Sequence, residues 1–440
     1  MNQDRPSGFA RLLKAVANVE PLEVKAVMIS FVYFFFLMAS YFILRPLRDT
    51  EGTIYGVDHL QELFTGTFIV SFIVAPLYAG FASRIRLATF LPWVYGVIAI
   101  SMVGFYFAFA ANENDRWVAA AFYVWLSTFN LLTISVFWSM MADIFSSPQA
   151  KRLFGFIAAG GTVGTIAAPA FITFFVKTVG TNTLLLISAA GFLVTAFLVR
   201  ALEAEKRKFA ARDQAAQRTS LDRSLGGNPF DGFVLLFKSR YLLMIALFLL
   251  LMTWISTVIY FQLGDLISHQ FASKAARTQA YATIDLATNS IAVLIQLFGT
   301  GRFIKRFGVT TGLLLNPVIM VFAFLAVVAA PGLLVLGSIQ VLRRFAEYAV
   351  AKPSRDMLFT VVDQQAKYKA KNVIDTVVYR FGDLSSSWLS HVILPFGVKG
   401  LAIFGVIVSV VWFPIAYLLG KRYESERGDE ASATQSAPVH

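Results

Sequence analysis

Runs of apolar residues long enough to cross a bilayer, about 20 residues each, follow one another along this chain. Residues 28–44, for example, include no charged side chain. Hydrophobic residues make up 57% of the 440 residues and charged residues only 15%, whereas soluble proteins carry about 25% charged residues. The pattern predicts an integral membrane protein and excludes a soluble enzyme or a disordered scaffold.

The spacing of these runs predicts an all-α membrane protein with 12 transmembrane helices in two six-helix halves. The spans are expected at 27–45, 64–82, 88–110, 117–142, 153–176, 182–201, 241–263, 280–300, 309–330, 332–351, 372–396 and 399–420. The chain would then divide into a cytoplasmic N-terminal segment 1–26, an N-terminal bundle 27–202, a cytoplasmic linker 203–240, a C-terminal bundle 241–420 and a cytoplasmic tail 421–440. The charged linker is expected to be solvated, and contact with anionic lipid is the alternative.

Basic residues gather in alternate loops, which predicts the orientation. The basic loops hold Arg84 and Arg86, Lys151 and Arg152, the stretch 200–240, Arg302, Lys305 and Arg306, Lys352 to Lys371, and Lys421 and Arg422. The opposite loops hold fewer basic residues. Because cytoplasmic loops carry the excess of Lys and Arg, both termini are expected in the cytoplasm.

A short loop that combines glycine and basic residues occurs at matching places in the two halves. The copies read Gly80-Phe-Ala-Ser-Arg84-Ile-Arg86 and Gly301-Arg302-Phe-Ile-Lys305-Arg306-Phe-Gly308. They resemble the signature loop of the major facilitator superfamily, although the first copy lacks the usual acidic residue. The resemblance implies two parallel repeats around a central cavity with alternating access; a chance match is the alternative.

Charge inside a membrane span is costly and usually faces a cavity. In span 280–300, Asp285 and Asn289 are four residues apart and share one helical face. In span 332–351, Arg343 and Glu347 have the same spacing and can pair, and Arg344 lies beside them. The charges therefore mark candidate functional positions in both spans.

Span 372–396 carries the longest polar stripe. Asp375, Tyr379, Asp383 and Ser387 recur every four residues, so a regular helix would align them over about three turns. Arg380 and Asp383 are three residues apart and can pair. This stripe predicts a polar face that looks into a cavity.

Two interpretations of these charges remain open. In the first, arginines bind an anionic group, while carboxylates carry a coupling proton or gate the cavity. In the second, the charges neutralise one another and hold the helices together. The candidate ligands are Arg45, Arg48, Arg343, Arg344, Arg380, Asn289, Tyr260 and Trp138, and the candidate coupling carboxylates are Asp285, Glu347, Asp375 and Asp383.

Two features have a packing alternative. Trp138 lies near Asn130 in its span, where it would either stack on a planar ligand or pack in the core. Gly160, Gly161 and Gly164 suggest a phosphate loop, but no Lys-Ser/Thr follows them. Close packing of helices is therefore the favoured role of these glycines.

Two segments resemble the ATP/ADP translocase family of plastids and intracellular bacteria. Residues 41–50 read Tyr-Phe-Ile-Leu-Arg-Pro-Leu-Arg-Asp-Thr, which places Arg45 and Arg48 on the arginine and lysine of the family motif. A second motif, before and within span 372–396, is matched at Pro353, Arg355, Asp356, Met357, Asp363, Gln364, Lys371, Asp375, Arg380 and Gly382. The resemblance implies a transporter of the major facilitator type in a bacterial inner membrane.

At several positions the sequence differs from the ATP/ADP translocase pattern, and these differences bear on which solute is transported. Nucleotide exchangers carry glutamates in the fourth and seventh spans, where this chain has Leu126 or Ser127 and Tyr260. The lysine after the Arg-Leu-Gly motif is replaced by Asp383. Arg48 keeps the charge of the motif lysine but changes its geometry. The resemblance therefore implies the transport class, and a solute other than ATP or ADP fits the residues equally well.

The sequence thus predicts a secondary transporter of a small anionic solute, ATP, ADP or another organic anion, with exchange and proton coupling both open. The alternatives are a proton-coupled exporter of drugs or lipophilic solutes and a non-transporting sensor or assembly protein on a transporter fold. The chain has no cysteine and four scattered histidines, and no nucleophile is paired with a base. We therefore expect no enzymatic activity, no cofactor, no metal and no nucleic-acid partner, with membrane lipid as the surroundings.

Overall fold

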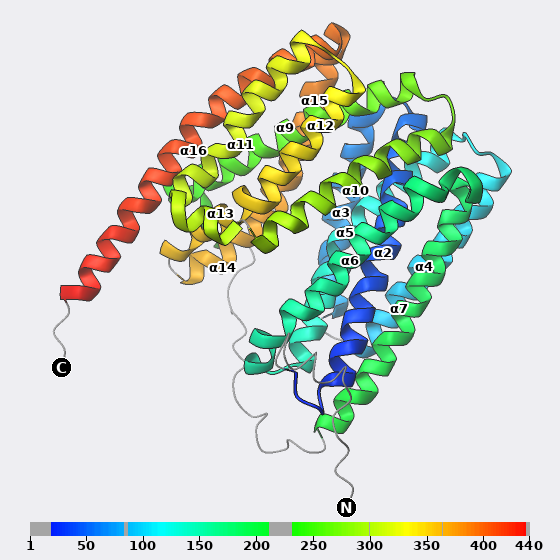
Figure 1. The fold of residues 1–440 in the computed structure, drawn as a ribbon, viewed down its shortest axis with the longest axis horizontal. Helices are drawn as coiled ribbons and strands as arrows, with labels where there is room; N and C mark the ends of the chain where they lie inside the picture. The colour runs from blue at the N-terminus through cyan, green and yellow to red at the C-terminus, as the bar shows by residue number, and fades with distance from the viewer. Residues whose placement is uncertain (1–18, 83–86, 211–230, 299, 363, 437–440) are drawn as a thin grey trace, which may run out of the picture. The chain divides into compact units, whose positions relative to one another are not determined.

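The computed structural model describes residues 19–82, 87–210, 231–298, 300–362 and 364–436 (Figure 1). Twelve successive helical rods account for almost all of them, in agreement with the predicted fold class. The rods are α2 (Val24–Tyr55), α3 (Leu60–Ala82), α4 (Leu87–Ala111), α5 (Arg116–Ile144), α6 (Ser147–Val179), α7 (Thr181–Ala210), α9 (Arg240–Gln270), α10 (Lys274–Phe298), α11 (Thr300–Ala329), α12 (Leu333–Ala346) with its continuation to Met357, α14 (Gln364–Val373) with α15 (Tyr379–Ile393), and α16 (Gly397–Ser436).

Several predicted boundaries move in the structure. The first span continues ten residues beyond 45 to Tyr55, so Arg48 and Asp49 lie within α2 despite Pro46. The predicted linker contains the last residues of α7 and a short helix, α8 (Asp231–Lys238), while residues 211–230 lie outside the described part. The predicted tail begins as a continuation of α16. The first copy of the repeated loop includes 83–86, which also lie outside the described residues.

The helices form two compact units, each with its own core. Unit 1 contains α2 to α7, without the first residues of α3, together with Phe271–Leu286. Unit 2 contains α8, α9, the remainder of α10 and α11 to α16, together with Gly56–Phe68. Each unit therefore includes a short segment from the other half of the sequence. This division follows tertiary contacts, and it differs from the predicted bundles 27–202 and 241–420.

Unit 1 is built around α2, which packs against α5, α6 and α7. A Cβ atom at Gly160 would overlap the backbone oxygen of Phe31, and one at Gly164 would overlap that of Phe35. These glycines therefore let α6 approach the backbone of α2 closely, which confirms the packing role favoured from the sequence.

Unit 2 packs α11 against α16 and α9 against α15 and α16. Gly382 of α15 faces Thr253 of α9, and Gly405 of α16 faces the ring of Phe324 of α11. The positive φ of 81° at Gly308 bends α11 near its start. Small residues again allow close contact between the long helices.

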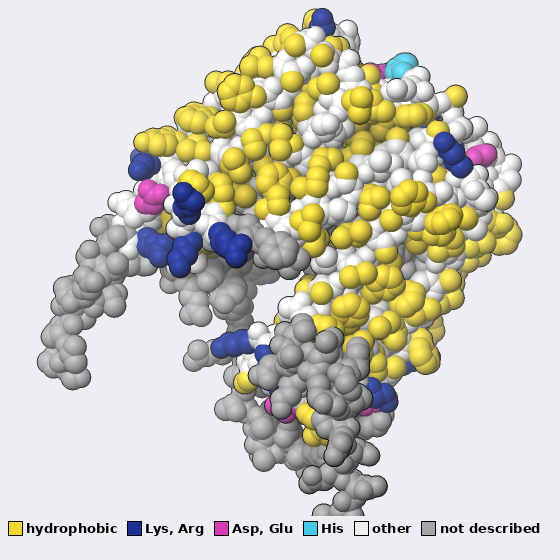
Figure 2. Space-filling model, viewed as in Figure 1, with side chains coloured by type: hydrophobic (Ala, Val, Ile, Leu, Met, Phe, Trp, Pro, Cys, Tyr) yellow, Lys and Arg dark blue, Asp and Glu magenta, His cyan; other side chains and the backbone are white. Residues whose placement is uncertain are grey.

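Apolar side chains cover wide areas of the surface (Figure 2). Ile100 of α4, Phe174 of α6 and Phe322 of α11 are among the large hydrophobic residues that are exposed. Among the described residues, eight segments are long and apolar enough to cross a membrane. A surface of this kind is suited to contact with lipid tails.

Candidate functional site

Unit 1 holds a charge cluster between α2 and the first half of α10, here called the α2–α10 cluster: Arg45, Arg48, Asp49, Glu51, Lys274, Arg277 and Asp285. Arg45 lies beside Asp285, with 3.6 Å between its Nε and the carboxylate Oδ2. The Arg45 guanidinium also lies 5.5 Å from the ring centroid of Phe42. Two predicted site residues that are 240 positions apart in the sequence are thus brought together.

Arg48 is held by its sequence neighbour. Its Nε and Nη2 donate to Oδ1 of Asp49 at 3.0 and 2.6 Å, and its Nη1 lies 3.4 Å from Oγ of Ser127. The guanidinium lies 5.2 Å from the ring centroid of Tyr123 on α5. Both contacts on α5 orient Arg48 while its charge is balanced by Asp49.

A buried ion pair in the same cluster was not identified from the sequence. Glu51 is fully buried, and its Oε1 lies 2.6 Å from Nζ of Lys274. Nζ also donates to the backbone oxygen of Glu113 at 3.2 Å and lies 4.1 Å from the ring centroid of Phe109. The sequence interpretation ended the first span at 45, because Pro46 and the charged residues that follow it are typical of a helix end, and so it left Glu51 outside the span.

Further hydrogen bonds extend this contact between α2 and α10. The hydroxyl groups of Thr50 and Thr278 lie 2.9 Å apart, and Nη1 of Arg277 donates to Oγ1 of Thr53 at 3.1 Å. Further along α10, Gln279 donates to the backbone oxygen of Thr173 on α6 at 2.7 Å. The first half of α10 is therefore attached to unit 1 by polar contacts along its length.

Unit 2 holds a second charge cluster, here called the α12–α15 cluster: Gln340, Arg343, Arg344, Glu347, Tyr379, Arg380 and Asp383. Arg343 donates from Nη1 to Glu347 at 2.6 Å and from Nε to Gln340 at 3.1 Å. Nη1 of Arg380 lies 3.9 Å from Oδ2 of Asp383. Both pairs predicted from helical spacing are present.

Tyr379 connects these two pairs. It lies within electrostatic range of Asp383, Glu347 and Arg380. Arg343 and Arg344 are both buried, and unit 2 therefore holds buried guanidinium groups beside the pairs Arg343–Glu347 and Arg380–Asp383. Such an arrangement can bind an anion, because arginine donates two parallel hydrogen bonds to a carboxylate or phosphate.

Two π-helical turns interrupt the helices of unit 2 at its charged residues. One covers Glu347–Ala351 and the other Ile374–Val378, which contains Asp375. Turns of this type often occur at functional sites because they displace side chains from the regular helical register. Asp375 therefore departs from the expected four-residue stripe and lies 3.1 Å from Nη2 of Arg355 on the helix Lys352–Met357.

The three predicted aromatic and amide ligands lie in different surroundings. Trp138 packs in the core of unit 1, with its ring centroid 5.5 Å from that of Phe34 and 5.3 Å from that of Phe154. Of the two roles considered for Trp138, this position agrees with packing in the core. Tyr260 lies in unit 2 with its ring centroid 5.8 Å from that of Phe64. Asn289 is half-buried in unit 2, although Asp285, four residues earlier, belongs to unit 1.

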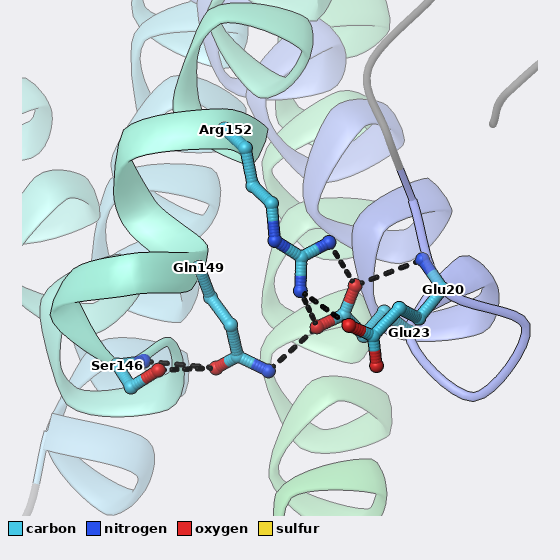
Figure 3. Close-up of polar contacts among 5 residues, drawn as sticks. All are labelled: Glu20, Glu23, Ser146, Gln149 and Arg152. Atoms are coloured by element: carbon cyan, nitrogen blue, oxygen red, sulfur yellow. Dashed lines mark hydrogen bonds and ion pairs between the residues drawn. The ribbon is translucent and has the colours of Figure 1, made fainter. Parts of the chain in front are cut away.

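A third polar network joins the residues before α2 to the start of α6 (Figure 3). Arg152 donates to both carboxylate oxygens of Glu23, at 2.7 and 2.5 Å, and Gln149 donates to Oε1 of Glu23 at 2.7 Å. The backbone N–H of Glu20 donates to Oε2 of Glu23 at 3.0 Å. Burial would raise the pKa of Glu23, but the hydrogen bonds from Arg152, Glu20 and Gln149 outweigh it, so the pKa lies below its usual value of 4.5.

This network has a structural explanation in the capping of α6. The side chain of Gln149 accepts from the backbone N–H and hydroxyl of Ser146 at 2.9 and 3.0 Å, which forms a capping box. Ser-x-x-Gln is a recognisable helix-start pattern that the sequence interpretation did not use. Within the described residues, no group of His, Asp and Glu side chains is arranged to hold a metal ion.

Comparisons with known proteins identify the class of this chain. ADP,ATP carrier protein 1 of Chlamydia muridarum is 23% identical, with 96% of this chain and 93% of that protein covered. ADP,ATP carrier protein 1 of Chlamydia pneumoniae is 22% identical over the full length of both. The resemblance to ATP/ADP translocases is confirmed. These relatives are transporters, which agrees with the prediction that the chain is not an enzyme.

Solved structures show the same fold. The nucleoside transporter NupG superposes with a TM-score of 0.60 at 16% identity and covers 91% of this chain and 98% of its own. A bacterial homolog of the human lysosomal transporter Spinster gives 0.62 at 14% identity and covers 93% and 99%. The sequence model of the Major Facilitator Superfamily matches residues 63–346. This integral membrane transporter therefore belongs to the Major Facilitator Superfamily.

Proposed function

We propose that the chain is a secondary active transporter that moves a small organic anion across a bacterial inner membrane by alternating access. The observation that carries this proposal is the α12–α15 cluster, in which Arg343, Arg344 and Arg380 stand against Glu347 and Asp383. Burial of charge in a membrane protein is costly and is usually retained for function. Buried arginine side chains inside a membrane protein favour an anionic solute, because a guanidinium group can donate two parallel hydrogen bonds to a carboxylate or phosphate.

The geometry of Arg343 supports a role in binding. Glu347 engages Nη1 and Gln340 engages Nε, so the guanidinium is held in a fixed direction from within its own helix region. A side chain held in this way loses less entropy when it binds a ligand. The adjoining π-helical turn at Glu347–Ala351 provides a local irregularity that a change of conformation can use.

Nucleotides are the first solutes to test, because the full-length relatives are named ADP,ATP carriers. The chain differs from nucleotide exchangers at Tyr260 and Asp383, where the family resemblance predicts acidic and basic residues respectively. These differences support testing other phosphorylated and carboxylated metabolites alongside ADP. The proposal therefore concerns anions as a class.

The way α10 is attached supports the proposal of alternating access. Its first half belongs to unit 1 through the pairs Glu51–Lys274 and Thr50–Thr278, while its second half belongs to unit 2. If units of a major facilitator protein rock during transport, a helix shared between them has to exchange contacts. We assign both termini to the cytoplasm by the charge of the loops.

The test is uptake of labelled ADP into proteoliposomes that contain the purified chain, either empty or preloaded with ATP. A panel of unlabelled sugar phosphates, dicarboxylates and nucleotides is then added as competitors. We expect at least one anion to bind or be transported, with about tenfold weaker binding in Arg380→Gln. Arg240→Gln, at an exposed arginine outside both the cluster and the repeated loop, is the matched control.

If no anion in the panel is transported or raises the melting temperature of the folded protein, the proposal is wrong. If Arg343→Gln and Arg380→Gln behave as Arg240→Gln does, the arginines of the cluster have a structural role only. Dependence on preloading distinguishes exchange from proton symport.

A second candidate is a proton-coupled exporter of lipophilic solutes. It is favoured by the internal pairing of the charges, since Arg343 lies 2.6 Å from Glu347 and Arg48 2.6 Å from Asp49. In this case, transport follows an imposed pH gradient, and Glu347→Gln abolishes it. Competition by hydrophobic cations and insensitivity to anions would favour this candidate.

A further inference from the structure

An apolar groove runs along the outside of unit 1 between the end of α4 and the start of α5. Its volume is about 470 Å³, and its lining includes Gly104 and Ala108 of α4 and Trp117, Val118 and Ala121 of α5. The small residues leave a depression between the two helices, and Trp117 forms one wall. The groove is almost entirely apolar, as the binding of a hydrocarbon chain requires.

The dimensions of the groove match part of an acyl chain. Its lining on α4 extends from Ser101 to Ala108, about 10 Å at 1.5 Å per helical residue, compared with about 15 Å for one leaflet of the hydrocarbon core. No atom lies within 4 Å of the position that a Cβ of Gly104 would take. The hydroxyl of Ser101 donates to the backbone oxygen of Ile98, so it needs no partner in the groove.

A cation is fixed at the mouth of the groove. The guanidinium of Arg116 lies 4.6 Å from the ring centroid of Tyr55 and 5.7 Å from that of Trp117. Within the described part of the chain, Arg116 has no ion pair and no side-chain hydrogen bond. The nearby carboxylate of Asp115 accepts instead from the backbone N–H groups of Trp117 and Val118 at 2.8 and 3.0 Å.

An anion lies in the same short loop. Glu113 is exposed, and its carboxylate makes no ion pair with any described residue; its backbone oxygen accepts from Lys274. Glu113 and Arg116 are three residues apart but do not pair with each other. A cation and an anion at the junction of the two helices that line the groove are complementary to a zwitterionic head group that is joined to an acyl chain.

We propose that this groove binds one molecule of phosphatidylethanolamine. An acyl chain lies along Gly104 and Ala108, the phosphate accepts hydrogen bonds from Arg116, and the ammonium group donates to Glu113. Trp117 lies where aromatic side chains typically mark the interface between membrane and water. The site is in the leaflet opposite the chain termini, and its existence does not depend on the transported solute.

The test is native mass spectrometry of the purified full chain with phosphatidylethanolamine, phosphatidylcholine or phosphatidylglycerol that carries the same acyl chains. We expect one phosphatidylethanolamine to be retained about tenfold more tightly than either other lipid. Gly104→Leu fills the groove and should abolish this preference. Gly96→Leu is the matched control, because Gly96 lies on the same helix and also has open space at its Cβ position.

The head-group variants separate the two contacts. Glu113→Gln should weaken binding of phosphatidylethanolamine most and leave phosphatidylglycerol, which has no ammonium group, unaffected, whereas Arg116→Gln should weaken binding of all three lipids. Melting temperatures in lipid-free detergent establish that each variant is folded. Equal retention of the three lipids by the wild-type protein, or equal loss in Gly104→Leu and Gly96→Leu, would show ordinary surface lipid and overturn the proposal.

Discussion

The α2–α10 cluster of unit 1 joins residues that are far apart in the sequence, whereas the α12–α15 cluster of unit 2 forms its pairs within a helix region. Glu51 and Lys274 are separated by 223 positions, and their contact attaches α10 to α2. Arg343 and Glu347 are four positions apart and connect no other helix through their ion pair. The comparison indicates that similar charges stabilise a tertiary contact in one unit and orient a candidate ligand-binding group in the other.

The largest expected effect comes from locking the contact between α2 and α10. The chain has no cysteine, so Thr50→Cys combined with Thr278→Cys introduces one pair at hydroxyl groups that lie 2.9 Å apart. Oxidation should form a disulfide and abolish uptake if, as we propose, α10 exchanges its contacts with α2 during transport. Uptake before and after reduction measures the effect. The single variants are the controls, and full transport by the oxidised double variant would show that this contact persists throughout the cycle.

Glu51→Gln should be the most destabilising single substitution in the two clusters. It leaves Lys274 charged and buried, and loss of one partner of a buried ion pair costs about 3 to 5 kcal/mol. Thermal unfolding in detergent measures the loss. Glu51→Leu combined with Lys274→Met should recover most of the stability, since it removes both charges. An unchanged melting temperature in Glu51→Gln would mean that the pair contributes nothing to the attachment of α10.

Arg343→Gln should affect solute binding more than stability. We expect about tenfold weaker binding, equivalent to about 1.4 kcal/mol, and a smaller fall in melting temperature than Glu51→Gln produces. Arg343→Lys keeps the charge but not the planar donors, so it should restore binding only in part. Dissociation constants and melting curves of the same preparations provide the comparison. A stability loss as large as that of Glu51→Gln would remove the contrast between the units.

The Glu23 network should give the smallest effect, with a defined pH dependence. Because the folded pKa of Glu23 is lowered, its stabilisation is present above the unfolded value near 4.5 and is lost as the pH falls through the folded pKa. Glu23→Gln should therefore cost about 1 kcal/mol at neutral pH and little in acid. Melting temperatures between pH 7 and pH 3 measure this difference. A parallel shift at every pH would exclude ionisation of Glu23 as the cause.

Much of the fold was predictable because its signals are local. Each membrane helix is encoded by its own apolar run, so all the rods were expected, with errors mainly at their ends. Helical spacing also predicted the Arg343–Glu347 and Arg380–Asp383 pairs, which the structure contains. The two motifs, around Arg45 and Arg48 and between Pro353 and Gly382, together with the repeated loop, indicated the class of transporter.

The remaining features depend on tertiary contacts. The pairs Arg45–Asp285 and Glu51–Lys274, and the assignment of Phe271–Leu286 to unit 1, arise where separate helices pack, and no local spacing encodes such a meeting. The π-helical turn that carries Asp375 has the same cause, because a single extra residue in a turn is tolerated only where neighbouring helices accommodate it. The sequence alone thus determined the helices and the membrane class through hydrophobicity and periodicity. Only the packing of those helices decided which charges meet.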